Sequence, residues 1–339
     1  MMKPGKLDSD LMRKLLKRYT VSDRRVILGP RVGEDAAVID PGKTSDQYWV
    51  VTADPITFTT EEIGFYGVVV NMNDIATRGA VPRWFAVTLL FPEKGSNERV
   101  IERVFRQIHL ACKQFHISII GGHTEVTRGI DQMILSGNMI GEVKKEKLVT
   151  TGGARTGDLL LLVKGVCIEG TSIIAREKGT ELLRKGIAPS LLRRAKNFIF
   201  DPGIEVLHAA RIACEAASVH SMHDPTEGGL INGIVEVALA SQREIEVDLE
   251  HVPIYRESRI LCGIYGLNPL GVIASGALLL TISPSDLSPL ERAFKRASIP
   301  MQVIGKVKNG PTARVLTGEG KRRKELKPLS RDEILKVFE

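Results

Sequence analysis

The sequence predicts an α+β protein of two domains. Its 339 residues, 43% of them apolar, are more than a single hydrophobic core usually accommodates. Strand-like and helical segments alternate in both halves, but without the regular strand-helix-strand spacing of a doubly wound sheet. A polar, glycine-rich stretch at residues 150–157 separates the halves. We therefore expect an N-terminal domain over residues 1–150 and a C-terminal domain over residues 151–339.

The first half opens with an amphipathic helix over residues 7–19. Four leucines recur there at helical spacing: Leu7, Leu11, Leu15 and Leu16. The elements expected next are strands at 26–28, 36–39 and 48–52, a helix at 64–77, a strand at 84–90, a helix at 97–115, and strands at 117–120 and 133–143. In the helix at 64–77, Asn71, Asp74 and Arg78 share the side opposite the apolar residues. That side is either the wall of a site or a solvated face.

The second half has a similar mixture of elements. Its expected elements are a strand at 158–163, helices at 168–178, 203–217 and 228–240, strands at 244–249 and 277–282, a helix at 289–297, and a strand at 301–307. No short-period repeat is visible in the sequence. Each half is thus mixed α and β, which favours the α+β class.

Charge and composition argue against a nucleic-acid protein. Lysine and arginine outnumber aspartate and glutamate by 47 to 40, which gives a net charge of +7. Part of the excess is the Lys-Arg-Arg-Lys run at residues 321–324, which is more typical of a solvated surface turn than of a nucleic-acid patch. Aromatic residues do not interleave with basic ones as they do in grooves that bind single strands. Nucleic-acid binding is therefore not favoured and stays a weak alternative.

Cysteine usage and hydropathy favour a soluble cytoplasmic protein. The four cysteines lie far apart, without a Cys-x-x-Cys pair, and are expected to be free thiols: Cys112, Cys167, Cys214 and Cys262. Residues 1–18 scatter charges through a helical pattern and lack the apolar core of a signal peptide. No later stretch reaches the length needed to span a bilayer, so we expect no membrane partner.

Carboxylates stand at the ends of several apolar segments. Acidic stretches lie at residues 33–40, 52–57 and 71–80, and a fourth, Gly-Gly-His-Thr-Glu, lies at 121–125. An oxygen ligand in such a position can face a cleft and bind Mg²⁺ that carries nucleotide phosphates. Asp35 and Asp74 could instead cap helices or turns, and Asp54 could begin an Asp-Pro turn. Because these segments occur together, we favour a nucleotide-phosphate enzyme.

Seven motifs in this order resemble the superfamily of aminoimidazole ribonucleotide synthetase, the PurM-like proteins. The motifs are Gly-Glu-Asp-Ala-Ala-Val (33–38), Thr-Ala-Asp (52–54), Asn-Asp-Ile-Ala-Thr-Arg-Gly-Ala-Val-Pro (73–82), Gly-Gly-His-Thr-Glu (121–125), Gly-Asp-Leu-Leu-Leu (157–161), His-Asp-Pro-Thr-Glu-Gly-Gly-Leu (223–230) and Ser-Gly-Ala-Leu-Leu (275–279). Members of the superfamily include the hydrogenase maturation protein HypE, thiamine-monophosphate kinase and selenophosphate synthetase. The likeness covers roughly residues 25–310 and is strongest to the HypE-like branch.

The resemblance implies both a fold and a chemistry. An N-terminal α/β domain would pair with a second subunit to form a β-barrel at a dimer interface, beside a C-terminal α+β domain. ATP and Mg²⁺ would bind in the cleft between the domains, and a phosphoryl group would pass to an acceptor oxygen. By similarity, Asp35, Asp54 and Asp74 would be the carboxylates that face magnesium or phosphate, and Asp74 would also act in catalysis.

Other residues of the motifs are candidates for the same site. Asn73 could hold Asp74 or a phosphate through its amide, or could simply be exposed. Gly121 and Gly122 could present amides to phosphate, with Thr124 beside them, or could form an ordinary turn at the end of a strand. Arg78 could form an i,i+4 ion pair with Asp74.

Two loops of the second half are candidates as well. In the loop at residues 222–229, Asp224 and Glu227 are the expected contributors to chemistry, and the amides at the start of the following helix could receive an anion. The alternative is that Thr226 or Asp224 only caps that helix. Ser275 and Gly276 resemble a loop that lines the ATP cleft, or form a turn that leads into a buried strand.

His123 departs from the family pattern, in which several relatives have aspartate after the two glycines. Glu125, two residues further along an extended segment, lies on the same side and could supply the missing metal ligand. A zinc site built from His123 and Glu125, or from His220 and His223, lacks a third placed ligand and is disfavoured.

The leading hypothesis is an ATP- and Mg²⁺-dependent phosphotransferase or synthetase-like enzyme that activates an acid, amide or phosphate-ester oxygen. HypE ends in a cysteine that carries a carbamoyl group, whereas this sequence ends Lys-Val-Phe-Glu, so carbamoyl dehydration is not expected. The acceptor, a small molecule or a group carried by a protein, is not identified by the sequence. The alternative is a non-catalytic nucleotide-binding regulatory or scaffold protein of the same fold.

Overall fold

A computed structural model describes residues 6–57, 59–310, 313–318 and 323–339. The chain divides into two compact units. One contains residues 23–29 and 36–148, and the other contains residues 30–35 and 149–339 together with the N-terminal segment up to residue 22. Part of the basic run at 321–324, namely residues 321 and 322, lies outside the described residues.

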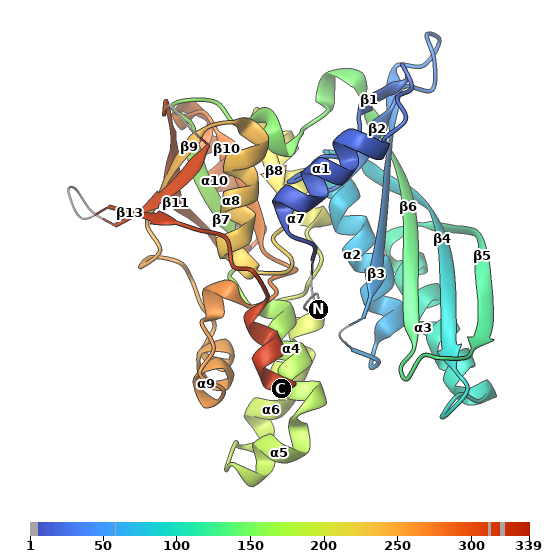
Figure 1. Cartoon of the computed structure of the whole chain (residues 1–339). Helices are drawn as coiled ribbons and strands as arrows, with labels where there is room; N and C mark the ends of the chain where they lie inside the picture. The colour runs from blue at the N-terminus through green and yellow to red at the C-terminus, as the bar shows by residue number, and fades with distance from the viewer. Residues whose placement is uncertain (1–5, 58, 311–312, 319–322) are drawn as a thin grey trace. The chain divides into compact units, whose positions relative to one another are not determined.

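The unit over residues 23–29 and 36–148 contains a six-stranded sheet and two helices, labelled in Figure 1. In spatial order the strands are β1 (Val26–Leu28), β2 (Ala37–Ile39), β3 (Gln47–Ile56), β6 (Ile134–Lys144), β4 (Val81–Pro92) and β5 (Ser118–Thr127). Neighbouring strands are antiparallel except β4 and β5, which are parallel. The helices are α2 (Ile63–Thr77) and α3 (Glu98–Phe115).

Helix α2 lies in the core of this unit, and all fifteen of its residues are buried. The alternative that its polar side is solvated is therefore wrong, and so is the alternative that Asn73 is exposed. Glycines let the helix approach its neighbours closely: a Cβ added at Gly67 would lie 2.3 Å from Leu135 of β6, and one at Gly64 would lie 2.7 Å from the backbone of α3. Buried polar side chains on such a helix need partners from the sheet.

The two glycines of the Gly-Gly-His-Thr-Glu motif lie inside β5, so the expectation of a turn at the end of a strand is wrong. They have positive φ angles, +144° at Gly121 and +149° at Gly122. A Cβ at Gly122 would lie only 1.8 Å from the carbonyl oxygen of Val87 on β4. The backbones of the two strands therefore meet at a distance that only glycine permits.

The other unit contains a seven-stranded sheet. In spatial order its strands are β13 (Lys324–Leu326), β12 (Arg314–Thr317), β9 (Glu244–Val247), β11 (Met301–Lys308), β7 (Leu159–Val163), β10 (Leu278–Ile282) and β8 (Val219–His223). Its α-helices are α1 (Ser9–Tyr19), α4 (Ile168–Glu177), α5 (Gly179–Arg184), α6 (Pro189–Lys196), α7 (Leu207–Ala216), α8 (Gly229–Ser241), α9 (Arg256–Ile264) and α10 (Leu287–Arg296). The sequence did not predict α5, α6, α9, β8, β12 or β13.

Hydrophobic burial explains the centre of this sheet. Every residue of β7 is buried, as expected for a continuous apolar run between two neighbouring strands. Leu160 and Leu162 belong to one core cluster with Leu230 and Ile234 of α8. Helix α8 thus packs on the sheet, and its first residues follow directly from the loop after β8.

No helix in the described part of the chain combines the length and apolar character needed to cross a membrane. Cys112, Cys167 and Cys262 are buried free thiols, in agreement with the expectation from the sequence.

Candidate active site

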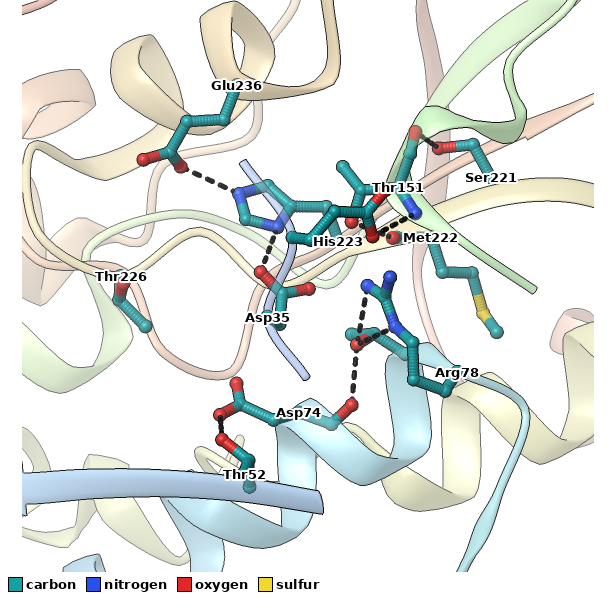
Figure 2. A network of polar contacts seen from close by, with 12 residues as sticks. Asp35, Thr52, Asp74, Arg78, Thr151, Ser221, Met222, His223, Thr226 and Glu236 are labelled. Carbon is teal, nitrogen blue, oxygen red and sulfur yellow. Dashed lines mark hydrogen bonds and ion pairs between the residues drawn. The ribbon is translucent and has the colours of Figure 1, made fainter. Parts of the chain in front are cut away.

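The candidate residues form one polar cluster in each unit. In the unit over residues 23–29 and 36–148, the cluster joins β3 to α2. The Thr52 hydroxyl donates to Asp74 Oδ2 at 2.6 Å, as Figure 2 shows. The Asp54 amide donates to Asn71 Oδ1 at 3.0 Å, and Asn71 Nδ2 donates to the carbonyls of Asp54 and Gly67 at 3.3 and 2.9 Å. Asn71 therefore links the backbone of Asp54 to α2 through hydrogen bonds.

The end of α2 continues this network. Thr77 Oγ1 donates to the carbonyl of Asp74 at 2.8 Å, and it accepts from Arg78 Nη2 at 3.1 Å. Asn73, Asp74, Thr77 and Arg78 are all buried, with Asp74 only 5% exposed. Asp74 is thus a buried carboxylate on a rigid helix, which is a suitable support for a ligand to a cation.

The structure does not bring Glu125 to this cluster. Thr52 lies in one row across the sheet with Met139 and Phe85, and this row faces α2. Leu90, five residues after Phe85, points to the opposite face and pairs with Glu125. The Glu125 side chain is 47% exposed on that face, where it lies 3.0 Å from His123 Nε2.

The second cluster lies in the other unit and is centred on His223, at the end of β8. His223 Nδ1 lies 2.7 Å from Asp35 Oδ1, and its Nε2 lies 2.8 Å from Glu236 Oε2 on α8 (Figure 2). Burial alone would lower the pKa of His223, but the charges and hydrogen bonds of the two carboxylates raise it to about 10. His223 is therefore an imidazolium at neutral pH, and it fixes the carboxylate of Asp35.

The preceding residues explain why Asp35 reaches His223. Glu34 accepts hydrogen bonds from the amides of Thr151 and Gly152 at 3.1 and 3.0 Å. Gly33 has a φ of +91°, and a Cβ there would lie 2.9 Å from the carbonyl oxygen of Glu236. The Gly-Glu-Asp motif is thus held against α8 and the turn at Thr151–Gly153. The roles of Glu34 and Glu236 were not predicted from the sequence.

This cluster offers carboxylate oxygens for a cation. Single ligand atoms of Asp35, His223 and Asp224 all lie within 4.8 Å of one another. Mg²⁺ prefers one or two carboxylates together with phosphate oxygens and water, so Asp35 and Asp224 fit it. Zinc fits less well, because it needs a neutral imidazole and both nitrogens of His223 are engaged by carboxylates. His220 is similarly occupied, with Nδ1 2.9 Å from Asp158 and Nε2 3.2 Å from Arg155.

The loop after Asp224 is held by a lysine from the N-terminal segment. Lys6 Nζ donates to Thr226 Oγ1 at 3.0 Å and forms an ion pair with Glu227 at 3.0 Å. Burial alone would raise the pKa of Glu227, but Lys6, together with hydrogen bonds from the backbone and from Thr226, outweighs that effect and the pKa is lowered. Glu227 is therefore a carboxylate at neutral pH.

The alternative that Asp224 or Thr226 caps the helix is wrong. The N-cap residue of α8 is Gly228, which has no side chain that could cap the helix. Instead, the amide of Gly228 donates to Asp332 Oδ2 at 2.7 Å. That amide, which the sequence suggested could receive an anion, is thus occupied by a carboxylate from the C-terminal segment.

Ser275 and Gly276 form a tight turn before β10, in which the amide of Ala277 donates to the carbonyl of Ala274 at 3.0 Å. Ser275 is 1% exposed and interacts with the buried Glu169 of α4. The turn interpretation is confirmed, and a ligand role for these residues stays a prediction.

Family models match most of the chain. The model described as AIR synthase related protein, N-terminal domain, matches residues 33–143, and the corresponding C-terminal domain matches residues 155–317. The chain belongs to the AIR synthase related protein family. The resemblance that the sequence motifs indicated is thus confirmed, together with the two-domain mixed α and β fold.

Curated relatives of this family member carry several names. A protein of Methanocaldococcus jannaschii named as a hydrogenase expression/formation protein is 27% identical over 83% of this chain and 81% of its own length. Carbamoyl dehydratase HypE of Rhizobium leguminosarum bv. viciae is 27% identical over 75% of this chain and 70% of its own. Thiamine-monophosphate kinase of Pyrococcus horikoshii is 27% identical over 82% of this chain and 84% of its own.

Solved structures agree on the fold. Hydrogenase maturation protein HypE in complex with ATP matches with a TM-score of 0.70 and 22% identity over 96% of both chains. AaThiL complexed with AMPPCP and TMP matches with a TM-score of 0.69 and 21% identity over 94% of both chains. At this level of identity the likeness concerns the fold.

Proposed function

We propose that this protein is an ATP- and Mg²⁺-dependent enzyme that transfers a phosphoryl group to an acid, amide or phosphate-ester oxygen. The observation that carries the proposal is the pair of the half-buried Asp35 and the buried Asp224, with Asp35 fixed by the imidazolium of His223. Two curated relatives, a carbamoyl dehydratase and a thiamine-monophosphate kinase, support an ATP-dependent enzyme of this family. Their names refer to a carbamoyl group and a phosphate monoester, which present an amide oxygen and a phosphate-ester oxygen.

Each carboxylate has a role in this proposal. Asp35 and Asp224 would hold Mg²⁺ in one unit, and Asp54 and Asp74 would face magnesium or phosphate in the other. Bound Mg²⁺ would neutralise the charge on the transferred phosphoryl group. Glu227, kept ionised by Lys6, would accept a proton from the acceptor or orient it.

The protein's own residues prepare this site before any ligand arrives. His223 holds Asp35 in one orientation through a buried ion pair, and Glu236 holds His223 from the other side. Asn71 fixes the backbone at Asp54, and Thr52 donates to Asp74. Fixed carboxylates lose little side-chain entropy on binding a cation, which favours affinity.

An assay of ADP formation tests the proposed reaction. Purified protein is incubated with ATP and Mg²⁺ and with a panel of carboxylic acids, amides and phosphate monoesters. We expect one class to stimulate ADP release, and Asp224→Asn to reduce that release at least tenfold. Nucleotide binding without ADP release under every acceptor would favour the alternative, a non-catalytic nucleotide-binding protein.

We also propose that the unit over residues 23–29 and 36–148 forms a homodimer through the open face of its sheet. Val51, Ile140 and Trp84 lie in one row across β3, β6 and β4 on that face, and all three are only partly buried. Strand β5 is an edge strand and is exposed along nearly its whole length. An apolar face beside an open strand edge favours pairing with a second copy. Light scattering should give twice the monomer mass, and Ile140→Asp should give the monomer mass.

A further inference from the structure

The C-terminal residues 329–339 form a strap across several loops of their unit. The amide of Leu329 donates to Asn232 Oδ1 at 2.7 Å, and Asn232 Nδ2 donates back to the carbonyl of Leu329 at 3.3 Å. Glu333 Oε2 accepts from the amide of Asn268 at 3.1 Å. Ile334 and Val337 are buried. The strap is thus tied down by polar contacts and by apolar burial.

Asp332 is the residue of the strap that reaches the candidate site. Its Oδ2 accepts from the amide of Gly228 at 2.7 Å, and its Oδ1 accepts from the amide of Ile334 at 2.7 Å. Asp332 is 4% exposed, and burial raises its pKa to about 6 against the opposing effect of these amides. A carboxylate at the first amides of α8 also interacts favourably with the helix dipole.

The loop between β8 and α8 has two consecutive glycines where α8 begins. Gly228 has a φ of +80°, and a Cβ there would lie 1.9 Å from Asn232 Nδ2. Gly229 has a φ of +61°, and a Cβ there would lie 2.6 Å from the carbonyl oxygens of Leu270 and Val272. Two consecutive glycines leave the backbone permissive, so a contact made here by another segment helps to select one conformation.

Contacts from within and outside the loop fix it along its length. The amide of Gly229 donates to the carbonyl of Thr226 at 3.0 Å, and Asn232 Nδ2 donates to the carbonyl of Glu227 at 3.4 Å. Lys6 binds Thr226 and Glu227, the amide of Ala274 donates to the carbonyl of Thr226 at 3.3 Å, and Asp332 binds the amide of Gly228. Of these, the contact of Asp332 is the one made to the amide of the N-cap residue, Gly228. A carboxylate 104 residues beyond the loop thus contributes to the conformation that presents Asp224 and Glu227.

We propose that Asp332 is a positioning residue, which fixes the loop at residues 224–228 so that Asp224 is presented to a magnesium-bound nucleotide. This inference rests on the proposed function for the role of the loop, but the contact of Asp332 with Gly228 can be tested without it. The C-terminal strap is, on this account, a fixed part of the site.

The test compares Asp332→Ala and Asp332→Asn with wild-type protein. Glu339→Gln serves as the matched control, because Glu339 lies on the same strap but pairs with Arg331. We expect hydrogen exchange at the amide of Gly228 to accelerate at least tenfold in Asp332→Ala. The Mg²⁺ concentration for half-maximal binding of a non-hydrolysable ATP analogue should rise about tenfold. Asp332→Asn, which keeps an acceptor oxygen, should restore part of both effects.

Each outcome decides the inference. Unchanged hydrogen exchange at Gly228 in Asp332→Ala would show that Asp332 does not hold this amide, and would refute the proposal. Faster exchange with an unchanged Mg²⁺ requirement would show that the contact is only structural, and would refute the positioning role. If wild-type protein bound no nucleotide while exchange at Gly228 still accelerated in Asp332→Ala, the proposed function and the positioning role would both fail. The contact between Asp332 and Gly228 would nevertheless be confirmed. The proposal would also be contradicted if Asp332→Ala and Asp332→Asn lowered the unfolding temperature equally and asparagine restored neither the exchange rate nor the Mg²⁺ requirement.

Discussion

Glu169 carries a buried charge whose removal should stabilise the protein above neutral pH. It lies in the first turn of α4, is 5% exposed, and its Oε2 has no hydrogen-bond partner among the described residues. Burial raises its pKa from the ordinary 4.5 to about 7, aided by the charges of Glu227 and Asp332 and opposed by hydrogen bonds from Ser275. The substitution Glu169→Gln keeps the shape of the side chain and removes the charge.

The magnitude follows from the difference between the two pKa values. At about 1.4 kcal/mol for each pH unit, the folded state should lose about 3 kcal/mol when Glu169 ionises. Below pH 4.5 the carboxyl is protonated in both states, so it makes no difference there. Between pH 4.5 and 7 only the folded state retains the proton, and wild-type stability falls as pH rises. Above pH 7 the full cost is present.

Urea unfolding of wild-type protein and Glu169→Gln at several pH values measures this effect. We expect the variant to be about 3 kcal/mol more stable at pH 8 and nearly equal at pH 4.5. A gain of this size corresponds to about 6–12 °C in unfolding temperature for a unit of this length. Glu291→Gln, at an exposed position on α10, is the matched control and should have little effect. If the variant were less stable than wild type at pH 8, or if the difference in stability did not change with pH, Glu169 would not carry the predicted cost of a buried charge.

Three other substitutions have expected outcomes. His223→Gln should destabilise the fold by about 3 kcal/mol at pH 7 in urea unfolding, because it removes a buried cation from between two half-buried carboxylates. The stabilisation by His223 should be complete below pH 6.5 and should disappear as pH rises through about 10, so an equal loss at pH 7 and pH 11 would contradict the ion pairs. Gly122→Ala should lower the unfolding temperature, since its Cβ would lie 1.8 Å from a carbonyl oxygen of Val87, and unchanged melting would refute the close approach. Asp74→Asn should weaken binding of a magnesium-bound ATP analogue at least tenfold while the circular dichroism spectrum stays native, and unchanged affinity would remove Asp74 from the site.

Local patterns predicted much of the fold. The leucine spacing located α1, the apolar run at 159–163 became β7, and the helix expected at 64–77 is α2. These features depend on neighbouring residues, so a single sequence contains them. The short helices α5, α6 and α9 were missed because their stability comes from packing more than from periodicity over their few residues.

Long-range contacts explain what the sequence could not predict at the site. The motifs contained Asp35 and His223, but nothing local indicates that Glu236 would complete an ion-paired triad. The capping interpretation of Thr226 failed because Asp332 reaches the same helix start from 104 residues away. Glu125 was expected to act with Asp74, yet strand parity places it on the other face of the sheet. Only the pairing of β4 with β5 decides that orientation.

Calorimetry measures directly whether Asp35 and Asp224 bind a nucleotide through Mg²⁺. Purified wild-type protein and Asp35→Asn are titrated with a non-hydrolysable ATP analogue, with and without Mg²⁺. We expect binding by the wild type that requires Mg²⁺ and is at least tenfold weaker in Asp35→Asn. Absence of binding in both conditions, or binding that neither Mg²⁺ nor the substitution alters, would show that these carboxylates do not bind a nucleotide through Mg²⁺.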